Sequence, residues 1–137
     1  MFSSPAVVVH GIDHARGALR PGLPVLLLSG PGIGVFAGCG WWRALIRAAT
    51  GEFPGTPATD LLDCANAPGP AMAALRIGQR GLVLSGSCPG FAAVSAAAAA
   101  LGAYVLADRP VALDLAVRGG GRRLEAWLRG DNPGLLR

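Results

Sequence analysis

The chain contains no lysine: its 12 basic residues are all arginine, and charged residues make up only 15% of the 137 residues. An average soluble domain is roughly 25% charged. Most arginines stand singly, and no arginine block alternates with aromatic residues, as a nucleic-acid stacking surface requires. We therefore expect no nucleic-acid partner, despite the net charge of +4. Together with 21 glycines and 11 prolines, the missing lysine indicates the composition of a GC-rich bacterial genome.

A long, strongly apolar run is also missing. The longest uncharged stretch, residues 81–107, is mostly alanine, glycine and serine with Pro89 inside it, whereas a membrane span needs about 20 strongly apolar residues. Residues 1–5 lack the charged region that begins an export signal. We therefore expect a cytoplasmic protein with no membrane partner.

Cysteine is scarce. Cys39, Cys64 and Cys88 are an odd number without a CxxC pair, so neither a disulfide framework nor a zinc site is indicated. We expect three free thiols and no bound metal. Because the chain is 52% hydrophobic and poor in charge, part of its surface is expected to be covered in a homo-oligomer, with a dimer favoured.

What the sequence does have is a repeated order of short apolar runs, small polar residues and helical stretches. The apolar runs predict buried strands near residues 6–9, 24–29, 59–64, 81–85 and 103–107, with a sixth short strand around 113–115. Helical periods and stop signals predict a helix over 14–19 capped by Asp13, and further helices over 35–50, 68–77, 91–101 and 122–129.

Strands that alternate with helices pair in parallel through right-handed crossovers. The predicted fold class is α/β, with a single open, mainly parallel sheet of about five strands and helices on both faces. This is a Rossmann-like or flavodoxin-like three-layer sandwich. We expect one domain over residues 1–137, in which 117–137 forms a C-terminal helix and tail.

In such sheets, ligands bind beyond the carboxyl ends of the strands, near the point where strand order reverses. Polar and glycine residues follow the predicted strands, and eight of them are candidate ligand-binding residues. These are Ser29, Gly30, Gly32, Gly34, Asp63, Asn66, Ser87 and Arg109. The turn from Ser29 to Gly34 would supply backbone donors, Arg109 a charge, and Asp63 or Asn66 orienting hydrogen bonds. Helix caps and tight turns use the same residue types at the same places.

The segment Gly32-Ile33-Gly34-Val35-Phe36-Ala37 fits the pattern G-x-G-x-x-A between a strand and a helix, where backbone N–H groups can hold a phosphate. A dinucleotide cofactor is disfavoured because Asp63 comes 31 residues after Gly32, whereas the ribose-binding acid is expected about 20 residues on. A simpler anion and a purely structural turn are the alternatives. The sequence identifies no cofactor.

Cys88 precedes a predicted helix, whose N-terminus would lower the pKa of a thiol. A cysteine enzyme would therefore use Cys88 as nucleophile and His14 as base, because His10 is expected within a strand. Buried cysteines that only pack are the alternative interpretation.

The adjacent residues Trp41 and Trp42 point about 100° apart on a helix, which predicts one indole in the core and one near the surface. An exposed tryptophan on a charge-poor helix indicates a contact face for another protein.

In element order, residues 24–101 resemble the STAS domains, which are small regulatory α/β modules. The resemblance is carried by Ser29-Gly30, by the strand that holds Asp63, and by Leu82-Val83-Leu84-Ser85-Gly86. The chain has Asn66-Ala67-Pro68-Gly69 where those domains carry an Asp-Ser-Ser-Gly type segment for phosphoregulation, so the resemblance implies a layout and no function.

The sequence favours a small α/β protein that binds a small anionic or nucleotide-like ligand at the carboxyl edge of its sheet. A cysteine-dependent enzyme using Cys88 and a non-catalytic interaction or regulatory module are the alternatives. Whether the protein is an enzyme is left open.

Overall fold

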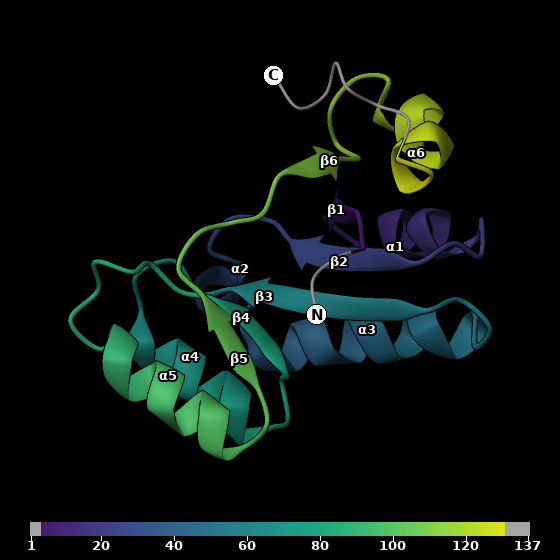
Figure 1. Cartoon of the computed structure of the whole chain (residues 1–137). Coiled ribbons are helices and arrows are strands. Elements are labelled where there is room, and N and C mark those ends of the chain that lie inside the picture. Colours follow the sequence, from purple (N-terminus) through teal and green to yellow (C-terminus); the bar gives the residue numbers. More distant parts are fainter. Residues whose placement is uncertain (1–3, 131–137) are drawn as a thin grey trace. The chain divides into compact units, whose positions relative to one another are not determined.

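The computed structural model describes residues 4–130. They form an α/β fold with an open sheet of six strands in the order β5-β4-β3-β2-β1-β6, so the predicted fold class is confirmed (Figure 1). The strands are β1 (Ala6–Val9), β2 (Val25–Ser29), β3 (Ala58–Asp63), β4 (Gly81–Val83), β5 (Tyr104–Leu106) and β6 (Ala112–Asp114). The helices are α1 (Ile12–Leu19), α2 (Ile33–Phe36), α3 (Cys39–Glu52), α4 (Pro68–Arg76), α5 (Phe91–Ala100) and α6 (Gly120–Leu128).

The described residues form two compact units. Unit 1 consists of residues 4–28, 45–59 and 110–130, and unit 2 of residues 29–44 and 60–109.

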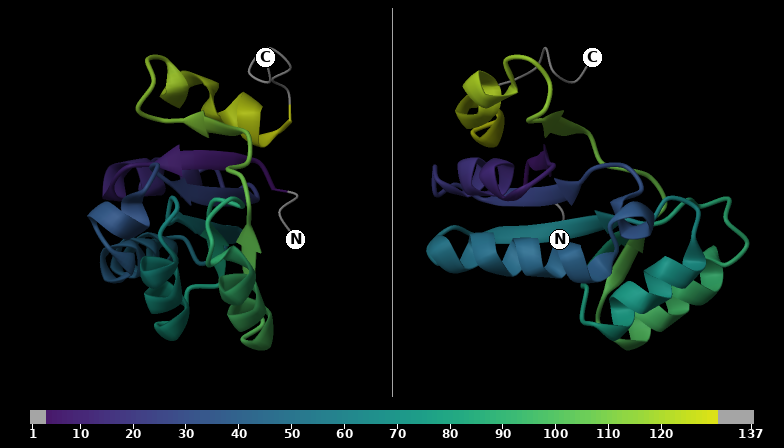
Figure 2. Two further views of the ribbon diagram at one scale, coloured as in Figure 1. Left: turned by 90° about the vertical axis from the view of Figure 1, so that its left-hand side faces the viewer. Right: turned by 180° about the vertical axis from the view of Figure 1, so that it is seen from behind.

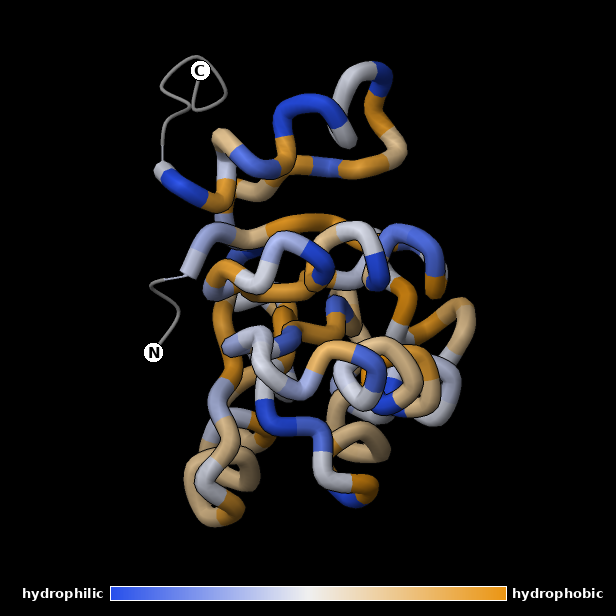
Figure 3. Tube along the Cα trace, turned by 90° about the vertical axis from the view of Figure 1, so that its right-hand side faces the viewer, coloured by the Kyte–Doolittle hydropathy of each residue, from blue (hydrophilic) through white to orange (hydrophobic). Residues whose placement is uncertain are grey.

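In unit 1, β1 pairs in parallel with β6, and Val8 lies opposite Asp114. Every side chain of β1 is buried, which explains its unbroken run of apolar residues. Helix α1 packs on β1 and α6 packs on β6. Helix α6, which leads to the grey C-terminal trace, alternates between hydrophilic and hydrophobic colour along the chain (Figure 3). Its buried Trp127 donates an Nε1–H hydrogen bond of 2.8 Å to the carbonyl of Ala6.

In unit 2, β4 lies between β3 and β5, and both pairings are parallel. Helices α4 and α5 lie side by side (Figures 1 and 2). The small side chains of α5 suit close packing, and its N-cap Gly90 comes so near to α4 that a Cβ atom there would stand 2.7 Å from Cβ of Pro68. The loops that lead into these two helices are therefore held together.

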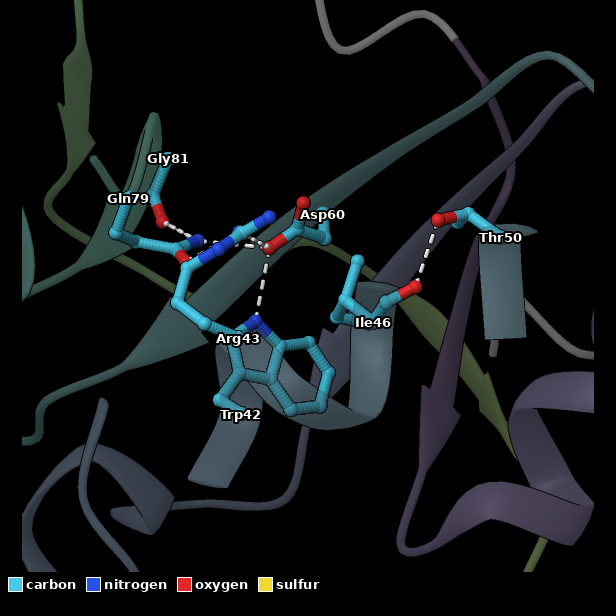
Figure 4. A network of polar contacts seen from close by, with 7 residues as sticks. All are labelled: Trp42, Arg43, Ile46, Thr50, Asp60, Gln79 and Gly81. Carbon is cyan, nitrogen blue, oxygen red and sulfur yellow. Dashed lines mark hydrogen bonds and ion pairs between the residues drawn. The ribbon is translucent and has the colours of Figure 1, made fainter. Parts of the chain in front are cut away.

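A polar network that includes the buried side chains of Trp42 and Gln79 joins α3, β3 and the segment before β4 in unit 2 (Figure 4). Oδ2 of Asp60 accepts hydrogen bonds from Nε1 of Trp42 at 2.8 Å and Nε2 of Gln79 at 2.8 Å, and Arg43 approaches it at 3.3 Å. Gln79 also donates to the carbonyl of Gly81 and accepts from Arg43. Each polar atom of the Gln79 side chain therefore has a partner, as burial requires. Trp42 is fully buried whereas Trp41 is 40% exposed, which confirms the predicted division between the two indoles.

Three local predictions were wrong. The helix predicted over 35–50 is divided into α2 and α3, because Gly38 adopts a left-handed φ of 88°. Asp13 does not cap α1, whose N-cap is Gly11, so Asp13 lies in the first helical turn. Strand β1 ends at Val9, which leaves His10 outside the strand and exposed.

The predicted C-terminal helix is present as α6, and residues 131–137 of the predicted tail lie outside the described residues. The organisation of residues 1–137 as one domain stays a prediction. No helix among residues 4–130 is long and apolar enough to cross a membrane.

Candidate functional site

Three of the predicted site residues, Ser29, Asp63 and Arg109, meet at the carboxyl end of β3 in unit 2. Together with Ala65 they form what we call the Asp63 cluster. Oγ of Ser29 accepts the backbone N–H of Asp63 at 2.9 Å and donates to the carbonyl of Gly30 at 3.0 Å. Oδ1 of Asp63 accepts the N–H of Ala65 at 2.7 Å, and Oδ2 accepts Nη1 of Arg109 at 2.6 Å. Both carboxylate oxygens therefore have partners within the cluster.

The Asp63 carboxylate also holds an unusual backbone. Ala65 has a φ of 53°, a left-handed conformation that a residue with a Cβ atom rarely adopts. Its N–H is fixed by Asp63, and its carbonyl accepts the N–H of Ser85 at 2.8 Å. The loop after β3 is thereby tied to the loop after β4, which gives the Asp63 cluster a structural role.

The predicted glycine turn leads into α2, which is a single helical turn. The N–H of Ile33 bonds to the carbonyl of Gly30, and the N–H groups of Val35 and Phe36 bond to the carbonyl of Gly32. These donors are therefore used within the turn. A Cβ atom on Gly34 would stand 2.7 Å from Sγ of Cys64, so close packing against the end of β3 explains this glycine.

The other predicted ligand-binding residues are more open. Asn66 and Ser87 are exposed, and Oγ of Ser87 lies 3.0 Å from Oγ of Ser85. The guanidinium of Arg109, whose side chain is 28% exposed, uses only Nη1 for Asp63 among the described residues. Asn66, Ser87 and Arg109 thus keep hydrogen-bonding groups available at this edge, and their ligand contact stays a prediction.

The two residues of the hypothetical thiol enzyme belong to different units, Cys88 to unit 2 and His14 to unit 1. Cys88 is buried, and its backbone N–H donates to the carbonyl of Ser85, which closes a turn. All three cysteines are free, as predicted. Burial raises the pKa of the Cys64 thiol to about 12, with smaller contributions from Asp63 and Cys39, so this thiol stays protonated at neutral pH and is a poor nucleophile.

Unit 1 contains a second group at the carboxyl ends of its strands, the histidine cluster: His10, His14 and Asp114. His10 directly follows β1, and Asp114 is the last residue of β6. Nε2 of His10 lies 2.8 Å from Oδ1 of Asp114, and the backbone N–H of His10 donates to Nδ1 of His14 at 3.1 Å. The two imidazole rings meet edge to face with centroids 5.6 Å apart. Both histidines of the chain are therefore in one place.

The strand order shows where the histidine cluster lies in the sheet. Strands β1 to β5 follow one another in one direction across the sheet, and β6 lies on the opposite side of β1. The order therefore reverses between β1 and β6, which makes their carboxyl ends the topological switch point, where ligands of open α/β sheets bind. His10 and Asp114 join these two strands.

Asp114 is held as a carboxylate. Burial alone raises its pKa, but the N–H of Ala116, the hydrogen bond with His10 and the charges of both histidines outweigh this, so the pKa of Asp114 lies below its ordinary value. An ionised carboxylate only accepts hydrogen bonds, so Nε2 of His10 carries the proton between them. Nδ1 of His14 accepts a backbone N–H, so a neutral His14 carries its proton on Nε2.

Sequence reasoning missed His10 and Asp114 as site residues. The available signals were a histidine pair four residues apart after a strand, and an aspartate at the end of the sixth apolar run. Their contact required knowing that β6 returns to the side of β1.

Residues 4–130 contain no group of three or more histidine, cysteine, aspartate or glutamate side chains that could hold a metal ion. Neither a protein-family model nor a curated protein sequence matches this chain.

Proposed function

We propose that the protein binds a small anionic ligand at the histidine cluster, at the carboxyl ends of β1 and β6. The observation that carries this proposal is the convergence of both histidines and Asp114 at the switch point of the sheet. His14 offers an Nε2–H donor there, and His10 is half exposed and oriented by Asp114.

The first turn of α1 adds donors for an anion. Its N-cap is Gly11, which has no side chain to cap the helix, and the first backbone hydrogen bond of the helix runs from the N–H of Ala15 to the carbonyl of Gly11. The N–H groups of Ile12, Asp13 and His14 therefore lack acceptors among the described residues, as at any helix start. Arg16 lies one turn on, paired with Glu52 at 3.1 Å and Asp13 at 3.6 Å.

The direct test is a titration with inorganic phosphate, followed by NMR of the histidine side chains and of the backbone amides. We expect saturable shifts of the His10 and His14 ring resonances that chloride at equal ionic strength does not produce. His14→Gln should weaken the effect, whereas Ser87→Ala at the carboxyl edge of unit 2 should leave it unchanged. Saturable shifts confined to Ser87 and Arg109 would instead place the anion at unit 2 and contradict the proposal.

One observation favours a second candidate, an interaction surface for another copy of this chain. Phe36 is 84% exposed, and the neighbouring Val35 and Trp41 are also exposed, all within unit 2. Phe36→Ser should lower the mass of the particle in sedimentation equilibrium if this surface forms a dimer. An unchanged mass would remove this candidate.

A further inference from the structure

Resting on the proposed anion site, we infer that His10 is an acceptor of phosphoryl groups and takes one onto its Nδ1 atom from an acyl phosphate. Nε2 of His10 is bonded to Oδ1 of Asp114, whereas Nδ1 has no hydrogen-bond partner among residues 4–130. A neutral His10 therefore presents the lone pair of Nδ1, which is the nucleophilic atom of an imidazole.

Asp114 supports attack by this atom. When Nδ1 of a neutral imidazole bonds to phosphorus, the ring becomes positively charged. The carboxylate 2.8 Å from Nε2 stabilises that charge and fixes the plane of the ring, as a carboxylate does for a catalytic imidazole. Asp114 is itself fixed, because Oδ1 also accepts the N–H of Ala116 at 2.9 Å. Asp114 is thus a positioning residue for His10.

The surroundings favour a phosphoryl group over a neutral electrophile. His14 has its Nδ1 occupied by the backbone of His10, so a neutral His14 directs an N–H donor from Nε2. Unpaired N–H groups of the first turn of α1 follow His10 in the chain, and such groups stabilise phosphate oxygens. The acidic residue Asp13 is 94% exposed and is screened by solvent.

The reaction balances without a further reactant. The lone pair of Nδ1 forms the N–P bond, and the P–O bond to the acyl oxygen breaks. The electrons of that bond leave with the carboxylate product. The proton on Nε2 stays in its hydrogen bond with Asp114, so no other base is needed.

The test incubates the full chain with acetyl phosphate and follows its intact mass and its ³¹P NMR spectrum. We expect one phosphoryl group per chain, located at His10 by peptide mapping and lost in acid. His10→Gln should abolish the adduct. Asp114→Asn should slow its formation by about tenfold, which corresponds to about 1.4 kcal/mol of transition-state stabilisation. Asp108→Asn, a change of the same kind at an exposed aspartate of unit 2, should have no effect.

Two results would overturn the inference. One is labelling of the folded chain at no greater rate than the chain in denaturant, or equally at His10 and His14, because either shows ordinary imidazole chemistry. The other is no adduct in a protein whose His10 and His14 resonances still shift saturably with inorganic phosphate, in which case anion binding stands and phosphoryl transfer fails. Absence of both effects would contradict the proposed function itself. NMR spectra of each variant establish that it is folded.

Discussion

The Asp63 cluster and the histidine cluster both place a carboxylate at the carboxyl end of a parallel strand, yet they differ in exposure and in unused hydrogen-bonding groups. Asp63 has a side chain only 6% exposed, and both of its oxygens are bonded within unit 2. His10 and Asp114 are 36% and 35% exposed, and Nδ1 of His10 has no partner among the described residues. A position at the carboxyl edge therefore does not by itself define a site, because a closed network stabilises loops whereas an open one can meet a ligand.

The largest expected effect on stability is at the Asp63 cluster, where both carboxylate oxygens are bonded. Asp63→Asn removes the ion pair with Arg109 and turns an amide toward either that guanidinium or the N–H of Ala65. We expect the free energy of unfolding to fall by about 3 kcal/mol, as when one partner of a buried pair is lost. Chemical denaturation measures this value. Asp108→Asn is the matched control, because Asp108 is exposed and has no hydrogen bond or ion pair among residues 4–130, and it should stay within about 0.5 kcal/mol of the parent.

If the two aspartate variants were equally stable, the Asp63 cluster would not be the structural element that its contacts indicate. Ligand binding by Arg109 and Ser87 would then become the better account of that edge.

The network around Asp60 is a second group of polar side chains that bond to one another. It tests whether such a network stabilises the protein as the Asp63 cluster is expected to do. Trp42→Phe keeps a ring in the core but removes the Nε1–H donor to Asp60. Hydrogen bonds to charged groups contribute about 1.5–3 kcal/mol, so we expect a loss of about 2 kcal/mol in denaturation experiments. The adjacent Trp41 is 40% exposed, and Trp41→Phe should change stability little. Equal losses in the two variants would mean that ring volume, and not the hydrogen bond, is responsible.

Packing at the Asp63 cluster is expected to be as closed as its hydrogen bonding. In Gly34→Ala the new Cβ atom would stand 2.7 Å from Sγ of Cys64 and 3.0 Å from the carbonyl of Asp63. Overpacking of this kind costs about 1–3 kcal/mol, which thermal and chemical denaturation would both report. Gly17→Ala in α1 meets nothing within 4 Å and should stabilise by about 0.5–1 kcal/mol. If Gly34→Ala left stability unchanged, the residues at the end of β3 would move easily to make room for the new Cβ atom, as expected of a ligand site.

The same contrast shows how far the sequence can predict this protein. Apolar runs such as Val25–Ser29 and the stop signal at Gly78 place the strands and helices within a few residues, because burial and left-handed turns depend on local residue types. The meeting of Ser29, Asp63 and Arg109 follows from strand order and was within reach. That these side chains use their hydrogen-bonding groups within the cluster could not be predicted, because the same residue types serve both turns and ligand sites.

The histidine cluster was harder to predict for a different reason. His10 was expected within a strand, and Asp114 was expected inside a weak sixth strand around 113–115. Their contact spans 104 positions of the chain. It exists only because β6 pairs with β1 and not with β5, and no local pattern specifies that choice.

The smallest expected effect on stability is at the histidine cluster. Asp114→Asn breaks a half-exposed pair, which contributes at most about 1 kcal/mol, so the loss in chemical denaturation should be below that of any variant above except the controls. Its pH dependence follows from the lowered pKa of Asp114 in the folded protein. The folded state releases this proton at lower pH than the unfolded state, so the contribution is complete above the ordinary value of 3.8 and is lost as pH falls through the lowered pKa. The difference between parent and variant should therefore disappear in acid, and a loss as large as that of Asp63→Asn would mean that the histidine cluster is a closed structural network as well.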